Sequence, residues 1–130
     1  MLFIDTCFLL SLVNVKSPNH EAALMINDLI KDEYTIINSI VLTELFNRLH
    51  QKRYEGVRQE IIDKVYEINK IHYLTKEDYD EAFKICNIYN FTVNYVDYAI
   101  LKTMMNYKVT TIISFDGDFD KIKGINKFYL

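Results

Sequence analysis

Four acidic residues, Asp5, Glu44, Asp97 and Asp116, stand close to the ends or starts of apolar and periodic runs in the sequence. If they meet in the fold their carboxylates repel, by about 4 kcal/mol for two unit charges about 4 Å apart at an effective dielectric of about 20. A hard divalent cation removes this repulsion, because Mg²⁺ and Mn²⁺ prefer oxygen ligands. A shared proton would remove it too and would indicate acid-base work. We favour a magnesium or manganese site.

Other metal and thiol chemistry finds little support among the remaining residue types. The three histidines, His20, His50 and His72, fall far from these acids in sequence, so a zinc site with imidazole ligands is not expected. The two cysteines, Cys7 and Cys86, have no spacing typical of zinc or redox motifs. We expect both to be buried thiols in a reducing compartment.

The elements that must position the acids alternate between strands and helices. Short apolar runs predict buried strands over Leu2–Asp5, Thr35–Asn38 and Thr111–Ser114, with weaker candidates over Ile71–Leu74 and Asn126–Tyr129. Strands separated by helices require crossover connections. The expected fold class is therefore α/β, a three-layer α/β/α arrangement around a central, mainly parallel sheet of four or five strands.

Helices are predicted from apolar residues at helical spacing between those strands. Met1 to Val13 is interpreted as strand followed by helix. Ser17 before Pro18, Thr75 with an acid three residues on, and Asn94 with an acid three residues on indicate helix starts. The expected stripes are Ala23, Ile26, Leu29, Ile30; Leu42, Leu45, Phe46, Leu49; Val57, Ile61, Val65, Ile68; Tyr79, Ala82, Phe83, Cys86, Tyr89; and Val96, Ala99, Ile100, Thr103, Met104, Tyr107.

This order of elements directs all four acids to one edge of the sheet. Asp5 and Asp116 follow strands, whereas Asp97 lies in the first turn and Glu44 in the second turn of helices that start at that edge. Each acid alone also fits a structural role, as a capping-box residue (Asp97), a turn former (Asp5, Asp116) or a helix-surface charge (Glu44). Their joint placement favours a common crevice.

Composition and hydropathy indicate the number of domains, the way a nucleic acid would be held, and the absence of a membrane segment. The 130 residues are half hydrophobic, which favours one globular domain over residues 1–130. The net charge of -3 indicates that any nucleic acid is held by a local patch of positive charge. The apolar N-terminus lacks the basic flank of a signal peptide, and no apolar run approaches the roughly 20 residues of a membrane span. A cytoplasmic protein without a membrane segment is expected.

Two groups of residues are candidates for contacts with RNA. Tyr95 and Tyr98 flank Asp97 and have rings that can stack on bases, although such residues more often pack in the core. A basic group near the end of the third helix can bind phosphates or can be a solvated helix end. It comprises Arg48, His50, Lys52, Arg53 and Arg58.

Four motifs together resemble the PIN domain family from the first strand to the last. They are Asp5-Thr6 after the N-terminal strand, Glu44 within Ser39-Ile-Val-Leu-Thr-Glu-Leu45, Asn94-Tyr-Val-Asp-Tyr-Ala-Ile100, and Ser114-Phe-Asp-Gly-Asp-Phe119. Within that family the chain most resembles the small single-domain toxin ribonucleases of the VapC type.

The resemblance implies metal-dependent hydrolysis of RNA phosphodiester bonds with Mg²⁺ or Mn²⁺, leaving a 5'-phosphate. By position, Asp5 and Asp97 would be the most direct metal ligands, with Glu44 and Asp116 completing the site directly or through water. The supporting residues that it implies are the hydroxyls of Thr6 and Ser114 and, in an outer position, the second acid Asp118.

The resemblance also implies an antitoxin partner and a homodimer, and apolar residues left over on the second to fourth helices can serve either contact. Two other functions stay open at this point. One is a non-catalytic PIN-like scaffold that binds RNA or protein, and the other is a metal-dependent DNA nuclease of related architecture.

Overall fold

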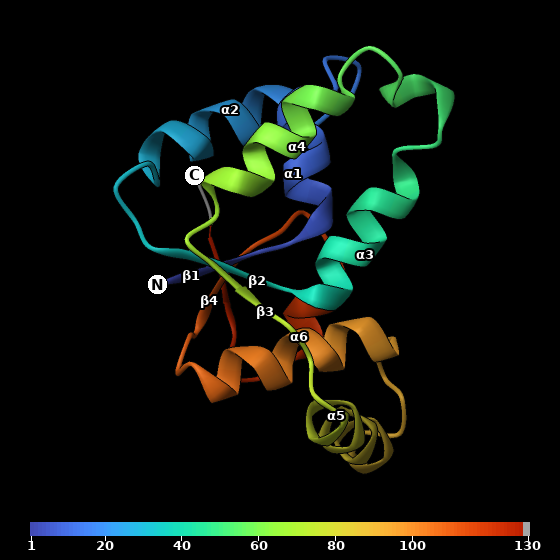
Figure 1. The fold of residues 1–130 in the computed structure, drawn as a ribbon. Coiled ribbons are helices and arrows are strands. Elements are labelled where there is room, and N and C mark those ends of the chain that lie inside the picture. The colour runs from blue at the N-terminus through green and yellow to red at the C-terminus, as the bar shows by residue number, and fades with distance from the viewer. Residues whose placement is uncertain (129–130) are drawn as a thin grey trace.

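The structure is a computed structural model in which residues 1–128 are described, and its centre is a five-stranded sheet (Figure 1). All four strand pairs are parallel, and the strand order is β3-β2-β1-β4-β5. This confirms the predicted α/β class and the parallel sheet. The strands are β1 (Leu2–Ile4), β2 (Thr35–Asn38), β3 (Lys70–His72), β4 (Thr111–Ile113) and β5 (Asn126–Lys127).

The predicted strands differ from these only at their ends. The third strand starts one residue earlier than expected and ends at His72. The fifth is a two-residue strand, and Tyr129, the last residue predicted for it, lies outside the described residues.

Helices cover both faces of the sheet, as expected for three layers. In Figure 1, α1, α2 and α4 lie above the sheet, α5 and α6 lie below it, and α3 stands at one edge, where it contacts both α1 and α6. No helix within residues 1–128 is long and apolar enough to cross a membrane. The helices are α1 (Thr6–Val13), α2 (His20–Leu29), α3 (Ser39–Arg48), α4 (Arg58–Glu67), α5 (Lys76–Ile88) and α6 (Tyr95–Asn106), with short 3₁₀ turns η1 (Lys52–Tyr54) and η2 (Gly117–Lys121).

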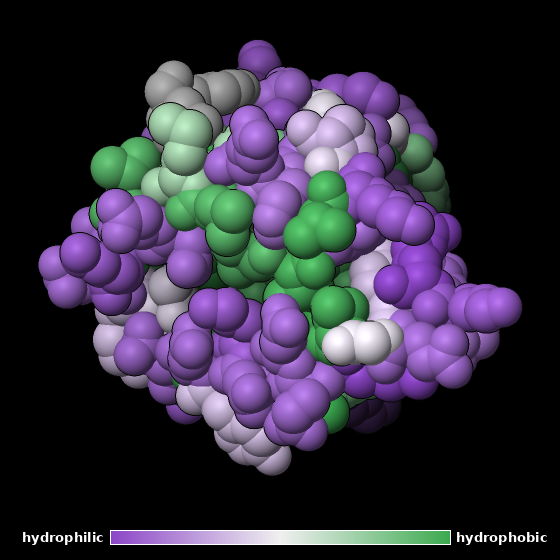
Figure 2. All heavy atoms as spheres, turned by 90° about the horizontal axis from the view of Figure 1, so that it is seen from above, coloured by the Kyte–Doolittle hydropathy of each residue, from purple (hydrophilic) through white to green (hydrophobic). Residues whose placement is uncertain are grey.

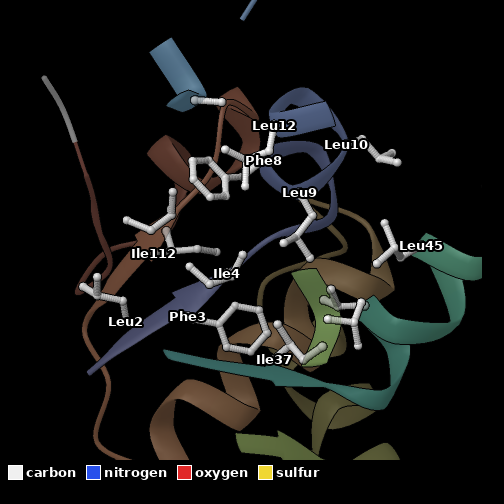
Figure 3. Close-up of a cluster of buried hydrophobic side chains, with 14 of the residues drawn as sticks. Leu2, Phe3, Ile4, Phe8, Leu9, Leu10, Leu12, Ile37, Leu45 and Ile112 are labelled. Atoms are coloured by element: carbon white, nitrogen blue, oxygen red, sulfur yellow. The ribbon is translucent and has the colours of Figure 1, made fainter. Parts of the chain in front are cut away.

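The core lies on both sides of the three central strands. Phe3 and Ile4 point to opposite faces of β1, and both are buried (Figure 3). Ile36 and Ile112 in the neighbouring strands are also fully buried. Because helices cover both faces, these strands are continuous apolar runs, and their polar residues come only where the strands end.

Asn38 is a fully buried polar residue that joins three elements near that edge. It ends β2 and caps α3, its Oδ1 accepting from the backbone N–H of Val41 at 2.9 Å. Its Nδ2 donates to Thr103 Oγ1 at 3.0 Å and to the Ala99 carbonyl at 3.4 Å, both in α6. One amide side chain therefore links the start of α3 to α6 by hydrogen bonds.

Some sequence-based expectations for helices are wrong. Helix α2 has Asn19 as its cap residue instead of Ser17; Ser17 Oγ accepts from the Asn19 N–H at 3.2 Å in the preceding turn. Five residues of the predicted stripes are exposed: Leu29, Phe46, Tyr79, Phe83 and Tyr89. In the stripe predicted for α5, only Ala82 and Cys86 are buried. Helix α5 packs mainly on α6, at the outside of the layer, so only a narrow face of it is covered.

Candidate metal centre

Asp97 is the most deeply buried of the acids at the carboxyl edge of the sheet. Asn94 caps α6, its Oδ1 accepting from the Asp97 N–H at 3.0 Å, and the Asp97 side chain is 4% exposed. Within residues 1–128, no hydrogen-bond donor reaches its buried Oδ2. A buried carboxylate oxygen without a donor is unfavourable, so its position indicates a ligand that the protein itself does not supply.

Asp116 and Asp118 complete a set of three carboxylates with Asp97. One oxygen from each lies within 4.8 Å of the others. Asp116 comes just after β4 and caps η2, where its Oδ1 accepts from the Asp118 N–H at 2.9 Å. Lys121 Nζ lies 3.3 Å from Asp118 Oδ1 and neutralises part of the charge. Asp118, expected in an outer position, thus lies in the set itself.

Asp5 lies beside this set and is joined to it by Ser114. Its Oδ1 accepts from the Thr6 N–H at 2.8 Å, and its Oδ2 accepts from Ser114 Oγ at 2.8 Å and lies 3.3 Å from Cys7 Sγ. Ser114 Oγ also accepts from the Asp116 N–H at 3.0 Å. Both oxygens of Asp5 are therefore engaged within the protein, unlike the free oxygen of Asp97.

Glu44 lies in the second turn of α3 and faces the acids just described. The sequence alone did not decide which face of its helix this residue occupies. Its side chain is half-buried, and its pKa is raised by burial and by the negative charge of Asp5, while Arg48 and Thr6 act in the opposite direction. The buried Thr6 thus lies between Asp5 and Glu44. The four acids singled out in the sequence all belong to one edge of the sheet.

The electrostatics of the set favour uptake of positive charge. Burial raises the pKa of Asp97 from its ordinary value of 3.8 to about 7, with further contributions from the charges of Asp116, Asp5 and Asp118. Burial also raises the pKa of Asp5, although Ser114 opposes the shift. A bound cation would therefore compete with a proton on Asp97 near neutral pH. Because the donors are carboxylate oxygens and one is buried without a partner, the residues fit Mg²⁺ or Mn²⁺.

Cys7 is a site residue that the sequence analysis missed. It is half-buried instead of lying in the core, and its Sγ lies 3.5 Å from Ser114 Oγ and accepts from the Phe115 N–H at 3.4 Å. Burial and the charge of Asp5 raise its pKa to about 12, so the thiol stays protonated. Because its neighbours in sequence are apolar, Cys7 was predicted to lie in the core. The only sequence signal for a place at the site was its spacing of two residues from Asp5.

The two tyrosines proposed as base contacts lie differently from each other. Tyr98 is 2% exposed and its ring stacks on that of Tyr89, so it offers no face to a base, and this expectation is wrong. Tyr95 is half-buried, and its hydroxyl donates to the Tyr79 carbonyl at 2.9 Å. Tyr98 thus packs against other side chains of the protein, as tyrosines at helical spacing usually do.

The basic residues near the end of α3 divide into two groups. Lys52 and Arg53 are exposed and Arg48 is half-buried. Arg58 Nε donates to the Leu49 carbonyl at 2.7 Å and holds the turn before α4, and His50 Nδ1 lies 2.6 Å from the Asn47 carbonyl. Arg58 and His50 thus have partners within the local backbone.

Parallel strands, covering helices and carboxylates gathered at the carboxyl edge define an α/β domain with a candidate cation site at that edge. The chain belongs to the PIN domain family, whose family model matches residues 2–125. No curated protein sequence matches the chain.

Two solved structures share the fold at low sequence identity. One is the Mycobacterium tuberculosis toxin VapC20, described as cleaving the sarcin-ricin loop, with 17% identity and a TM-score of 0.78 over 93% of this chain and 94% of that one. The other is VapBC2 from Rickettsia felis, bound to a DNA fragment from its promoter, with 17% identity and a TM-score of 0.70 over 98% of both chains.

Removing the Ser114 hydroxyl tests how far the position of the acids depends on this residue. Ser114→Ala removes the donor to Asp5 and the acceptor for the Asp116 N–H, so we expect the affinity of the candidate site for Mn²⁺ to fall about 10- to 100-fold, the range for groups that orient ligands. Calorimetric titration with Mn²⁺ measures the affinity. Thr43→Ala, which removes an exposed hydroxyl bonded to the Ser39 carbonyl, is the control. Equal affinities in both variants would contradict the role of Ser114.

Proposed function

We propose that the chain is a divalent-metal-dependent endoribonuclease and the toxin of a toxin–antitoxin pair. The observation that carries the proposal is the buried Asp97, whose Oδ2 has no donor among the described residues and which contributes one carboxylate oxygen to a set with Asp116 and Asp118. Membership of the PIN domain family and the likeness to a toxin that cleaves the sarcin-ricin loop support the choice of RNA as substrate.

In this proposal Asp97, Asp116 and Asp118 hold Mg²⁺ or Mn²⁺, and Asp5 completes the site from the side. The bound ion would neutralise phosphate oxygens and stabilise the leaving oxygen. Ser114 and the Thr6 N–H keep Asp5 in place. Glu44, half-buried and with a raised pKa, is the carboxylate placed to take a proton from the attacking water.

Metal binding is tested by the thermal midpoint of the protein during titration with Mg²⁺ and Mn²⁺. A ligand that binds only the native state adds about 2.7 kcal/mol at a concentration 100 times its dissociation constant. For a chain of this size, we expect the midpoint to rise by about 10 °C. Parallel assays on single-stranded RNA and on single-stranded and duplex DNA, with and without chelator, identify the substrate.

The outcomes of these assays separate the alternatives. A midpoint that does not move with either metal would contradict the metal site and favour a scaffold without catalysis. A rising midpoint with cleavage of DNA but not RNA would retain the metal site and identify a DNA nuclease.

The proposed protein partners are an antitoxin and a second copy of this chain. Helix α2 leaves Leu24, Met25 and Leu29 exposed. The face that includes α2 and α4 carries a gathering of hydrophobic residues among hydrophilic ones (Figure 2). Such a face is typical of a protein contact. Light scattering of the chain alone, and after coexpression with the product of any short reading frame that adjoins its gene, measures which partner binds there. A monomer in both samples would contradict both partners.

A further inference from the structure

A groove of about 440 Å³ lies next to the acidic site, between α1 and the segment that runs from the end of α3 into η1. Its wall on one side comes from Cys7 and Ser11 of α1 and from Lys16 in the following loop. Arg48, Arg53 and Tyr54 form the wall on the other side. The volume is in the range of pockets that hold small organic groups, and its walls carry polar side chains among apolar ones.

The groove is continuous with the acidic site. Cys7 lines it, and Cys7 Sγ lies 3.3 Å from Asp5 Oδ2 and 3.5 Å from Ser114 Oγ. Arg48 lies one helical turn after Glu44, and its positive charge lowers the pKa of that residue. A chain molecule bound in the groove would therefore reach the acids at its inner end.

The charged side chains that line the groove are all positive. They are Lys16, Arg48 and Arg53, and no carboxylate lines it. None of the ion pairs among residues 1–128 involves these three cations, although the charge of Arg48 acts on Glu44 at longer range. Cations without an ion-pair partner, gathered in one hollow, are typical of phosphate recognition.

The groove also contains two serine hydroxyls and an aromatic ring that contacts one of its cations. The guanidinium of Arg53 lies 5.7 Å from the ring centre of the buried Tyr54, a cation–π contact that restricts it. The hydroxyl oxygens of Ser11 and Ser17 lie 3.2 Å apart on the opposite wall. Hydroxyls beside cations are a common way to bind a sugar-phosphate backbone.

We propose that this groove holds the sugar-phosphate backbone of a single RNA strand next to the bond to be cut, with Arg48 nearest the acids and Arg53 and Lys16 farther out. The inference rests on the proposed ribonuclease function and assigns a place to its substrate. The inference separates the basic residues that would bind RNA from those that would not. Lys52 does not line the groove, whereas Lys16, more than thirty residues before Arg48 in the sequence, does.

The test measures RNA affinity by fluorescence anisotropy, with a labelled single-stranded oligonucleotide and with Asp97→Asn as background so that the RNA stays intact. We expect Arg53→Glu and Lys16→Glu each to weaken binding about tenfold or more and to lower the slope of affinity against salt by about 1. Arg53→Lys, which keeps the charge, should retain most of the affinity. Lys52→Glu is the matched control, with the same charge change in the same 3₁₀ turn, and should change affinity less than twofold.

Thermal midpoints of all variants verify that the exposed substitutions leave the fold intact. Equal loss of affinity in Lys52→Glu and Arg53→Glu, or no loss in either groove variant, would overturn the assignment. A glutamate-rich peptide that binds more tightly than the RNA and is released by the same variants would assign the groove to an acidic protein segment instead. Failure of the ribonuclease proposal is seen separately, as the absence of a metal-induced rise in the midpoint.

Discussion

Replacing Asp97 with asparagine is expected to lower the RNA-cleavage rate at least about 10³-fold, a change of about 4 kcal/mol in the activation barrier. The variant keeps the shape of the side chain and the Asn94 cap, which bonds to the backbone of residue 97. It removes the charge of the buried oxygen that has no donor among the described residues. Single-turnover cleavage of single-stranded RNA with Mg²⁺ or Mn²⁺ measures the loss.

The same substitution should stabilise the metal-free protein above neutral pH. The pKa of Asp97 is raised by burial and by neighbouring acids to about 7, from 3.8. Between these two pH values the native state retains a proton that the unfolded state has lost, so stability falls as pH rises and the full loss is present above about pH 7. The loss is on the order of 4 kcal/mol at most. Asparagine has no charge to bury, so this pH dependence disappears.

Measurements of unfolding by urea at pH 5 and pH 8, in the presence of chelator, test this linkage. Asp80→Asn, an exposed residue paired with Lys76, is the control and should leave the pH dependence as in the original chain. If Asp97→Asn cleaves RNA at the original rate, or if its metal-free form loses as much stability between pH 5 and pH 8 as the original, Asp97 is not the centre of the site.

Asn38→Ala is expected to lower the free energy of unfolding by about 3 to 4 kcal/mol. The loss combines a helix cap worth about 1–2 kcal/mol with the two buried hydrogen bonds that Asn38 Nδ2 donates to Thr103 Oγ1 and the Ala99 carbonyl, at about 1 kcal/mol each. For a protein of marginal stability this is a large fraction of the total. Urea unfolding measures it, with Asn87→Ala on the exposed face of α5 as the control.

A second variant separates the two roles of Asn38. Asn38→Ser keeps an oxygen that can cap α3 but cannot reach α6, so it should lose less stability than alanine and still lower cleavage through the altered position of α3. If alanine and the control lose the same stability, the buried amide does not join α3 to α6 as described.

The parallel sheet and the edge that carries the acids were predictable because they follow from short-range patterns, whereas the strand order was not predicted. Buried parallel strands are continuous apolar runs, and Thr35–Asn38 is bounded in the structure as predicted. Once strands alternate with helices, residues after the strands must meet at one edge. Asp5 and Asp116 reach the site by that rule, without knowledge of any side-chain contact.

Two helix starts show what such short-range patterns do not predict. Thr75 with Asp78 and Asn94 with Asp97 have the same spacing, and both caps form. In the first, Asp78 Oδ2 accepts from the Thr75 N–H at 3.0 Å, closing the box. In the second, the Asp97 carboxylate makes no such bond and turns its free oxygen to the site. Whether such an acid caps its helix or lines the candidate metal site depends on its neighbours in space, which come from segments remote in the sequence.

Other features depend on contacts that local sequence does not encode. Asp118 joins the carboxylate set because η2 turns it back toward Asp97. Tyr98 is buried because Tyr89 lies against it. Lys16 reaches the basic groove through the loop between α1 and α2. Each of these positions results from how elements pack.

The pairing of β1 with β4 also determines when the set of carboxylates can form during folding. Leu2 is aligned with Thr111 in the sheet, so two segments more than a hundred residues apart must meet before Asp5 and Asp116 lie together. Contacts of such long separation form slowly, because the intervening chain must first lose conformational freedom. A partly folded chain in which β4 has not yet paired with β1 therefore has an incomplete set of carboxylates.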